Sequence, residues 1–397
     1  MESGCVVRLR RGREKPVLWG HPWIFSGAVK EITGYEEPGG LCTVEDERGN
    51  ILATGYANTN SRITVRVLAR ERVSIGPGFI SNALENALHL RERVFGSSTL
   101  KSPSGAFRVV NAEGDYLPGL VVDRYGAGLV IQAHTAGMQK LKGLVVDELE
   151  KLFHPSFIYE RADPRGAESE GFCPSEGCLK GRLAPKVEIE EDGARFLVDV
   201  VGGQKTGFYL DQRHSRAIVK SIASGASILN CFSYTGAFGI QAHLGGARHV
   251  VNVDVSERAL SLAREQIALN GIPMEKSALI AEDVFDYLRK DKESYDVVVL
   301  DPPKFCGSIA ELEGAARGYK DINLNGLRRV KNGGFLASFS CSGAVSEDLF
   351  QKIVFGAARD AGRPVQIVRR LHADADHPVN LAHREGEYLK GLLLRVL

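Results

Sequence analysis

Two apolar segments, each ending in reactive or polar side chains, decide the fold class of this chain. The first reads Val298-Val299-Leu300-Asp301-Pro302-Pro303-Lys304-Phe305, and the second reads Leu336-Ala337-Ser338-Phe339-Ser340-Cys341-Ser342-Gly343. Short apolar runs that end in turn residues are typical of strands buried on both faces of a parallel sheet. Ligands bind at the carboxyl ends of such strands. We therefore expect a site where Asp301, on a stiff Pro-Pro corner, lies beside Cys341.

From about residue 190, predicted strands alternate regularly with predicted helices. The strands are expected at residues 227–231, 249–253, 278–281, 296–300, 335–339, 366–371 and 389–396. The helices between them include residues 236–244, 257–270 and 347–361. This alternation predicts an α/β fold with a mainly parallel, doubly wound, Rossmann-like sheet and a ligand crevice at its carboxyl edge.

The first part of the chain has a different pattern. Short β segments separated by Gly-rich or charged turns, from about residue 6 to residue 72, predict a small β-rich module. A predicted helix at residues 79–95 then opens a second α/β segment. We predict a β-rich domain over residues 1–75, a central α/β domain over 76–190 and the doubly wound domain over 191–397.

The stretch from Pro164 to Pro185 is polar and rich in Gly, Pro and Ser, so we predict a mobile loop. It contains Cys173 and Cys178, whose spacing matches no standard zinc pattern and is followed by no second Cys/His pair nearby. We interpret them as two free thiols and predict no metal site.

Composition places limits on the class of protein. A chain of 397 residues is longer than a single hydrophobic core supports, so two or three domains are expected. No apolar run approaches the roughly 20 residues of a membrane helix, and the N-terminus lacks the apolar core of a signal peptide. Seven scattered cysteines suit a reducing compartment better than a disulfide framework. We therefore expect a cytoplasmic protein with no membrane partner.

The formal net charge is only +1, so any nucleic-acid contact must be local. The densest basic cluster consists of Arg8, Arg10, Arg11, Arg13 and Lys15. These cations suit contacts with RNA phosphates. From charge alone, a solvated basic arm is the favoured alternative.

The first strand of the doubly wound sheet leads into a turn that suits a cofactor. The turn residues proposed to bind it are Asn230, Phe232, Ser233, Tyr234, Thr235 and Gly236. The pattern is not GxGxxG, so a dinucleotide fits less well. Asp254 ends the second strand, where it can bind ribose hydroxyls, and Asp283 follows the third, near the expected adenine amino group.

Ribose and adenine contacts without a phosphate loop indicate S-adenosylmethionine rather than a nucleotide. Taken singly, each acid could equally be a helix cap. Three acids at three successive strand ends, Asp254, Asp283 and Asp301, favour a binding crevice.

Several motifs together resemble the RlmI-type methyltransferases, which methylate carbon 5 of a cytosine in large-subunit ribosomal RNA. They include Gly207-Phe208-Tyr209-Leu210-Asp211-Gln212-Arg213, the 230–236 turn, Asp301-Pro302-Pro303-Lys304-Phe305, Arg317-Gly318-Tyr319-Lys320-Asp321-Ile322-Asn323 and Ser338-Phe339-Ser340-Cys341-Ser342-Gly343. The resemblance also covers His21-Pro22-Trp23-Ile24-Phe25-Ser26-Gly27, Ala375-Asp376-His377-Pro378 and Tyr388-Leu389-Lys390-Gly391. Nearly the whole chain is included, and the 164–185 stretch matches least.

The resemblance implies more than the spacing does. It implies that the N-terminal module is an RNA-binding PUA domain and that the middle domain is peculiar to these enzymes. It implies S-adenosylmethionine as cofactor, with the segment from Phe208 to Gln212 closing over it. It also names Cys341 as nucleophile and large-subunit ribosomal RNA as partner, and it leaves open whether the chain forms a homodimer.

Carbon 5 of cytosine is too weak a nucleophile to attack a sulfonium methyl group directly. A thiolate that adds to carbon 6 makes carbon 5 enamine-like, and we assign this covalent role to Cys341. Asp301 is expected to hydrogen-bond the cytosine ring nitrogen or amino group. Cys306 is a rival nucleophile just past the Pro-Pro corner, and Cys231 is expected to pack inside the protein. Lys304 has no assigned role.

Two other functions are compatible with the same residues. Asp-Pro-Pro followed by an aromatic residue also resembles sites that hold an exocyclic or amide nitrogen for methylation without a thiol. Lys304 stands where that aromatic residue is wanted, which weakens this alternative. The third hypothesis is a non-catalytic RNA-binding protein that senses S-adenosylmethionine.

Overall fold

The computed structural model describes residues 4–397, apart from the side chains of Arg165 and Ile309. The predicted first domain begins at residue 1, so its first three residues lie outside the described part. The chain divides into two compact units. One contains the chain up to Ile189 with Val198–Leu210 and Ala375–Gly386; the other contains Glu190–Leu197, Asp211–Asp374 and Glu387–Leu397. The proposed domain limits near residues 75 and 190 stay predictions.

The first unit opens with a six-stranded sheet in the order β2-β6-β5-β4-β1-β3. Its strands are β1 (Cys5–Leu9), β2 (Trp23–Phe25), β3 (Val29–Thr33), β4 (Gly40–Glu45), β5 (Ile51–Ala57) and β6 (Ile63–Ala69), and a short helix, α1 (Lys15–Leu18), follows β1. Alternate residues of β1 are buried, as expected of a strand with one face on a core. The predicted β-rich module is therefore confirmed.

A second sheet of the same unit has the order β11-β10-β9-β8-β7. Its strands are β7 (Ala106–Asn111), β8 (Leu120–Tyr125), β9 (Gly128–Ala133), β10 (Phe157–Glu160) and β11 (Gly177–Gly181). The helices are α2 (Pro77–Phe95), α3 (Ser97–Lys101), α4 (Ala136–Phe153) and α5 (Pro164–Glu170). Apolar residues of α2 and α4 pack with those of the sheet in one core.

The prediction of a loop over residues 164–185 is wrong, because the stretch contains α5 and β11. Helix α5 forms because Asp163 accepts a hydrogen bond from the Gly166 amide at 3.2 Å and so caps its first turn. Strand β11 forms because it pairs antiparallel with β10 at the edge of the sheet. The Gly- and Ser-rich composition hid both elements. A hairpin of β12 (Lys186–Glu191) and β13 (Ala194–Asp199) follows.

The second unit contains a seven-stranded sheet in the order β16-β15-β14-β17-β18-β20-β19. Its strands are β14 (Ser227–Cys231), β15 (His249–Asp254), β16 (Ser277–Ala281), β17 (Tyr295–Leu300), β18 (Val330–Ser340), β19 (Val365–His372) and β20 (Lys390–Val396). The five strands from β16 to β18 pair in parallel, and β20 pairs antiparallel with both β18 and β19. The predicted α/β fold with a mainly parallel sheet is confirmed.

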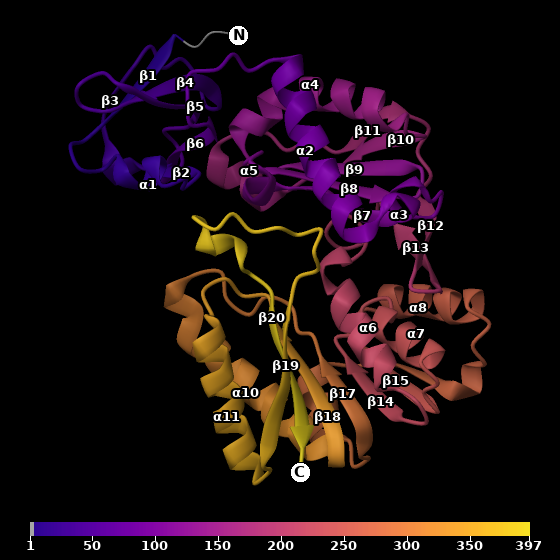
Figure 1. Ribbon diagram of the computed structural model, residues 1–397. Helices are drawn as coiled ribbons and strands as arrows, with labels where there is room; N and C mark the ends of the chain where they lie inside the picture. Colours follow the sequence, from indigo (N-terminus) through magenta and orange to yellow (C-terminus); the bar gives the residue numbers. More distant parts are fainter. Residues whose placement is uncertain (1–3) are drawn as a thin grey trace. The chain divides into compact units, whose positions relative to one another are not determined.

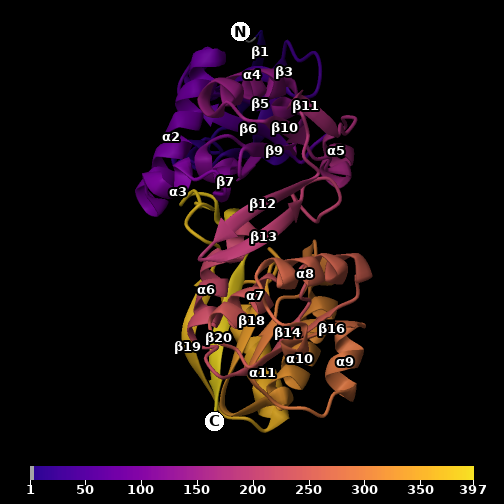
Figure 2. The same ribbon diagram turned by 90° about the vertical axis from the view of Figure 1, so that its right-hand side faces the viewer.

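Helices cover both faces of this sheet (Figures 1 and 2). They are α6 (Arg213–Ser221), α7 (Ala237–Leu244), α8 (Glu257–Leu269), α9 (Val284–Lys290), α10 (Leu312–Arg329) and α11 (Glu347–Ala361). Apolar residues of α9, α10 and α11 share one core with the sheet, and those of α6 and α7 share a second core with its opposite face. Alternate residues of β17 enter the two cores, which explains its unbroken apolar sequence.

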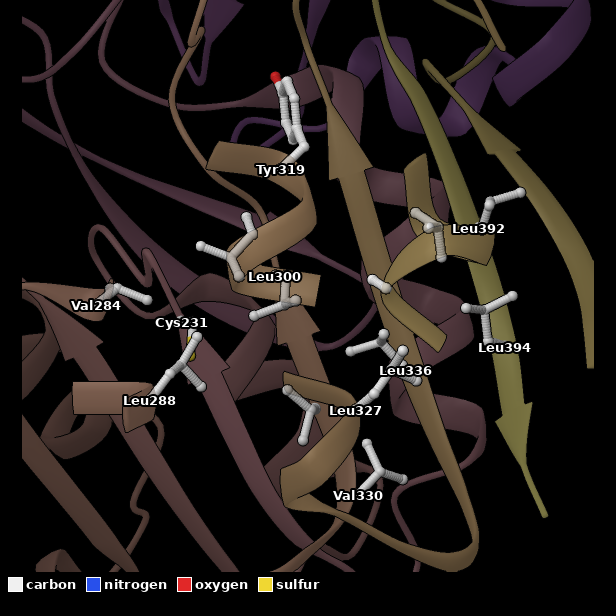
Figure 3. Packing of buried hydrophobic residues seen from close by; sticks show 14 of the residues in the cluster. Cys231, Val284, Leu288, Leu300, Tyr319, Leu327, Val330, Leu336, Leu392 and Leu394 are labelled. Carbon is white, nitrogen blue, oxygen red and sulfur yellow. The ribbon is translucent and has the colours of Figure 1, made fainter. Parts of the chain in front are cut away.

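The first of these cores includes residues of β17 and β18, the two strands that end at Asp301 and Cys341 (Figure 3). Leu300 and Leu336, from β17 and β18, are fully buried in it with Leu327 of α10. A β-carbon at Gly326 of α10 would lie 2.9 Å from a methyl carbon of Leu300, so glycine permits the helix to pack closely on the strand. Among the described residues, no helix is long and apolar enough to cross a membrane.

Candidate active site

The two segments that opened the sequence analysis meet in the structure. Strands β17 and β18 are parallel neighbours, with Leu300 paired to Ser338, so their carboxyl ends lie at the same edge. The Cys341 Sγ lies 3.8 Å from the Pro302 carbonyl oxygen. Cys341 is half-buried rather than sealed in the core. A thiol at this corner remains within reach of a ligand in the crevice.

The turn after β14 has an unusual backbone. Phe232 and Tyr234 adopt φ values of 57° and 48°, in the left-handed region that non-glycine residues avoid. The turn is held by a hydrogen bond from the Ser233 amide to the Val253 carbonyl at 3.0 Å and by one from the Tyr234 amide to Asp254 Oδ2 at 2.8 Å. Strained turns of this kind persist where surrounding contacts fix them, and they cluster at ligand sites.

Asp254 is the last residue of β15 and pairs with Ala281 at the end of the parallel strand β16. Asp283 comes two residues after Ala281, so the two acids lie at neighbouring strand ends. Asp254 also accepts a hydrogen bond from the Ser256 amide through Oδ1, at 2.9 Å. Asp283 is exposed and caps α9 by accepting from the Asp286 amide at 3.1 Å. Asp283 is therefore a helix cap, as the alternative interpretation has it. Only its Oδ1 takes part in the cap.

Asp301 lies in an environment that disfavours its charged form. Burial and, to a lesser extent, the negative charge of Asp211 raise its pKa, Gln212 and Arg216 lower it, and the net result is a pKa of about 7. Asp211 accepts a hydrogen bond from the Tyr388 hydroxyl at 2.6 Å. A carboxyl group with this pKa is a ready proton donor near neutral pH.

Arg216 is the positively charged residue that acts on Asp301. It is 1% exposed, and its Nε and Nη2 donate to the two carboxylate oxygens of Glu191 at 2.6 Å each. Arg213 connects Glu191 to Asp374, with Arg213 Nη1 lying 3.1 Å from the Asp374 carboxylate. The bidentate pair fixes a buried cation near Asp301.

Comparison with known proteins identifies the class of this site. A family model described as an S-adenosylmethionine-dependent methyltransferase matches residues 172–395, and a model of a PUA-like domain matches residues 7–70. The chain belongs to the S-adenosylmethionine-dependent methyltransferase family. The predicted cofactor and the predicted PUA-like N-terminal domain both agree with these matches.

Full-length relatives and solved structures agree with this membership. The ribosomal RNA large subunit methyltransferase I of Alteromonas mediterranea is 43% identical over 98% of both chains. The protein of that name from Salmonella arizonae is 41% identical over 98% of this chain and 97% of its own length. These relatives confirm the predicted membership of the RlmI-type group.

Two solved structures share the fold with a TM-score of 0.84 and 22% identity. One is assigned as a methyltransferase of Streptococcus mutans and covers 98% of this chain and 100% of its own. The other, solved in complex with SAH, covers 98% of this chain and 99% of its own.

The 230–236 turn of the methyltransferase fits a polar cofactor. Asn230, Ser233 and Thr235 are at most 7% exposed. Asn230 donates from Nδ2 to Asn252 at 2.8 Å, but its Oδ1, Ser233 Oγ and Thr235 Oγ1 have no hydrogen-bond partner among the described residues. Buried polar atoms without partners are uncommon in a finished fold. They suit a site that S-adenosylmethionine completes.

The methyltransferase site includes residues to which the sequence analysis gave no role. Lys390, at the start of β20, is 4% exposed and donates to the Ser342 carbonyl at 2.8 Å. Burial lowers its pKa, and the nearby Cys341 acts in the opposite direction. The Tyr319 hydroxyl lies 2.9 Å from Ser342 Oγ, and Figure 3 shows it at the end of the ring away from the aliphatic core. A lysine inside the apolar 389–396 run was the available signal for Lys390.

The rival cysteines occupy the core. Cys306 is 1% exposed and Cys231 is fully buried, both within the same apolar cluster (Figure 3 labels Cys231). Burial raises the pKa of the Cys231 thiol, which keeps it protonated. Of these three thiols, Cys341 is the only one that is not fully buried. Lys304 is exposed and still has no assigned role.

The other predicted cofactor residues fall in different units. Gln212 is buried in the second unit, where its side chain hydrogen-bonds Asp301. Phe208 is buried in the first unit, where its carbonyl accepts from the Tyr125 hydroxyl at 3.3 Å. In the basic cluster, Arg8 is held by Glu31 and Glu45 at 2.5 and 3.1 Å. The remaining members are exposed: Arg10, Arg11, Arg13 and Lys15.

Proposed function

We propose that this methyltransferase acts on carbon 5 of a cytosine in large-subunit ribosomal RNA through a covalent adduct with Cys341. The observation that carries the proposal is the half-buried Cys341 thiol, 3.8 Å from the carbonyl of Pro302, at the strand end next to Asp301. The printed names of the full-length relatives support ribosomal RNA as the substrate.

The residues can divide the reaction between them. A thiol has an ordinary pKa of about 8.5, so Cys341 needs a neighbour that favours its thiolate. Lys390 supplies a buried positive charge for this purpose. The thiolate adds to carbon 6, and Asp301 in its protonated form donates a hydrogen bond to the cytosine ring nitrogen, where negative charge develops.

Addition of the thiolate turns carbon 5 into a nucleophile. Bound S-adenosylmethionine supplies the electrophilic methyl group. Carbon 5 gains that methyl group as the methyl–sulfur bond of the sulfonium breaks, and it then loses its proton to a base. The electron pair of the broken carbon–hydrogen bond restores the double bond between carbons 5 and 6 and expels the Cys341 thiolate. Each turnover thus returns the thiol to its starting state.

The test is methyl transfer from radiolabelled S-adenosylmethionine to undermethylated ribosomal RNA, with Cys341→Ala compared to Cys306→Ala. We expect Cys341→Ala to lose transfer and Cys306→Ala to keep it, because only Cys341 lies at the crevice. Full activity of Cys341→Ala would exclude the covalent mechanism. Mass mapping of the methylated nucleoside separates a carbon-5 product from methylation of an amine, and no transfer by the parent would exclude catalysis on this RNA.

A further inference from the structure

One motif of the chain has no part in the proposed chemistry so far. It is Arg317-Gly318-Tyr319-Lys320-Asp321-Ile322-Asn323, on helix α10. Its tyrosine is fully buried, and Figure 3 shows the hydroxyl at the end of the ring away from the aliphatic core. A buried phenol hydroxyl costs free energy unless it finds hydrogen-bond partners. The partners of Tyr319 therefore indicate the role of the motif.

The Tyr319 hydroxyl interacts with both serines that flank Cys341. It lies 2.9 Å from Ser342 Oγ, and Ser340 also acts on it through a hydrogen bond. Both serines are fully buried. A tyrosine hydroxyl has one proton to donate and lone pairs to accept, so it can donate to one serine and accept from the other. Tyr319 thus holds the chain directly before and directly after the proposed nucleophile.

Backbone amides complete this network. The Ser342 amide donates to Ser340 Oγ at 3.4 Å, and the Cys306 amide donates to Ser342 Oγ at 3.4 Å. The second bond joins the segment that carries Cys341 to the segment that follows the Pro-Pro corner. Ser338, two residues before Ser340, is equally buried, but its Oγ has no hydrogen-bond partner among the described residues. The network is therefore not a general property of buried serines on β18.

Neighbouring aromatic rings fix the position of the Tyr319 ring. Its centroid lies 4.6 Å from that of Phe305 and 5.8 Å from that of Phe350. A β-carbon at Gly318 would lie 3.3 Å from a ring carbon of Phe305, so glycine at this position lets α10 lie close to the Phe305 ring. These contacts hold the Tyr319 hydroxyl in one place, which is what a positioning group requires.

We propose that Tyr319 is a positioning residue, whose hydroxyl holds Ser342 and so keeps the Cys341 thiol where it can add to carbon 6 of the base. The proposal rests on the proposed function, because Cys341 is the nucleophile assigned there. The role differs from that of Lys390, which donates to the Ser342 carbonyl and carries a charge. A neutral hydroxyl acts through geometry, and a misplacement of about 1 Å can slow a reaction about a hundredfold.

The first measurement is alkylation of Cys341 by iodoacetamide in protein without RNA or S-adenosylmethionine. Tyr319→Phe removes the hydroxyl and keeps the ring. We expect Cys341 to react about threefold faster, because the segment moves more freely and exposes the half-buried thiol more often. The midpoint of the pH–rate curve should stay where it is, since no charge is lost. An unchanged alkylation rate would overturn the proposal.

Two matched variants separate this role from a general loss of stability. Tyr295→Phe removes the hydroxyl of another buried tyrosine, which donates to Asp291 at 3.0 Å at the start of β17. Ser338→Ala removes the serine hydroxyl that has no partner within the described part of the chain. Both variants should leave the alkylation of Cys341 unchanged. An acceleration as large as that of Tyr319→Phe in either variant would overturn the proposal.

A double-mutant cycle tests whether Tyr319 acts through Ser342. Ser342→Ala should also speed the alkylation of Cys341. The double variant should react no faster than Tyr319→Phe alone, because that change already removes the bond between the two hydroxyls. Additive accelerations would overturn the assignment.

Methyl transfer is the readout that depends on the proposed function. Tyr319→Phe should lower kcat by about tenfold or more and leave the KM for S-adenosylmethionine within about twofold, because it changes only the hydrogen bonds beside Cys341. A raised KM with an unchanged kcat would overturn the proposal. If the parent transfers no methyl group while Tyr319→Phe still speeds alkylation, the proposed function alone is overturned.

Discussion

The Lys390 ammonium group donates a 2.8 Å hydrogen bond to the carbonyl of Ser342, the residue that follows Cys341. The antiparallel pairing of β18 with β20 creates this contact, since Lys390 pairs with Ser340. Lys390 is almost completely buried, so water screens its charge poorly. The structure thus places a buried cation against the segment that carries the proposed nucleophile.

Replacing Lys390 by methionine should make Cys341 less reactive near neutral pH. Loss of the positive charge removes a group that favours the thiolate, so we expect the midpoint of the pH–rate curve for alkylation of Cys341 to rise by about one pH unit. Mass spectrometry of iodoacetamide-treated protein measures this rate at one residue. Methyl transfer should fall with it.

Lys331→Met is the matched control for that experiment. Lys331 lies on β18 of the same sheet and pairs with Asp296 at 2.9 Å, and its change should leave the alkylation midpoint of Cys341 where it is. The same midpoint in Lys390→Met and the parent would contradict the electrostatic role of Lys390.

Asp301→Asn should stabilise the protein at alkaline pH while it impairs function. Burial holds the pKa of Asp301 at about 7, above the ordinary 3.8, so between these values the folded state binds a proton that the unfolded state has lost. The free energy of unfolding therefore falls as pH rises through that interval. Asparagine cannot ionise, so we expect a gain of about 2–4 kcal/mol at pH 8 and little gain near pH 4.

Urea unfolding at both pH values measures this difference. The control is Asp296→Asn, which should change stability at pH 8 in the opposite direction. Burial raises the pKa of Asp296, but hydrogen bonds from Ser227 and Lys331 outweigh it and lower the pKa overall. Stability from Asp296 is therefore present above its ordinary pKa and lost as pH falls through its lowered value. Asp296→Asn should lose stability at pH 8. A loss of similar size in Asp301→Asn would contradict the raised pKa.

The parallel sheet and the position of its site could be predicted because they depend on local sequence. Strands buried on both faces leave continuous apolar runs, and β14 and α11 begin and end at the residues predicted for them. Helix α10 was not predicted, because Gly318 and Gly326 interrupt its pattern and the reason for Gly326 is its close approach to Leu300. That approach is invisible in the sequence.

The features of the site that the sequence did not reveal also depend on contacts between residues that are far apart in the sequence. Lys390 contacts Ser342 across 48 positions of sequence, and the raised pKa of Asp301 comes first from burial and then from Asp211, both of which only the folded chain creates. The position of an acid at a strand end can be predicted from a pattern. Its protonation state depends on neighbours brought together by tertiary structure.

The buried ion pair next to Asp301 should matter more for stability than surface pairs do. Arg216→Met leaves Glu191, whose side chain is 3% exposed, without its bidentate partner, so we expect a loss of about 3–5 kcal/mol in unfolding free energy. Lys352→Met removes an exposed pair with Asp348 and should cost less than about 0.5 kcal/mol. Thermal and urea unfolding measure both. Equal losses of unfolding free energy in the two variants would show that the buried pair stabilises the protein no more than the exposed pair does.

The basic cluster should be detected through the salt dependence of RNA binding. Arg10, Arg11 and Arg13 are exposed, whereas Arg8 is already paired with two carboxylates, so the variant to make is the triple change of the exposed arginines to glutamine. If each arginine contacts one phosphate, the slope of log affinity against log salt should fall in magnitude by about 2–3. Arg8→Gln alone should change the slope little. An unchanged slope in the triple variant would exclude this cluster as a phosphate contact.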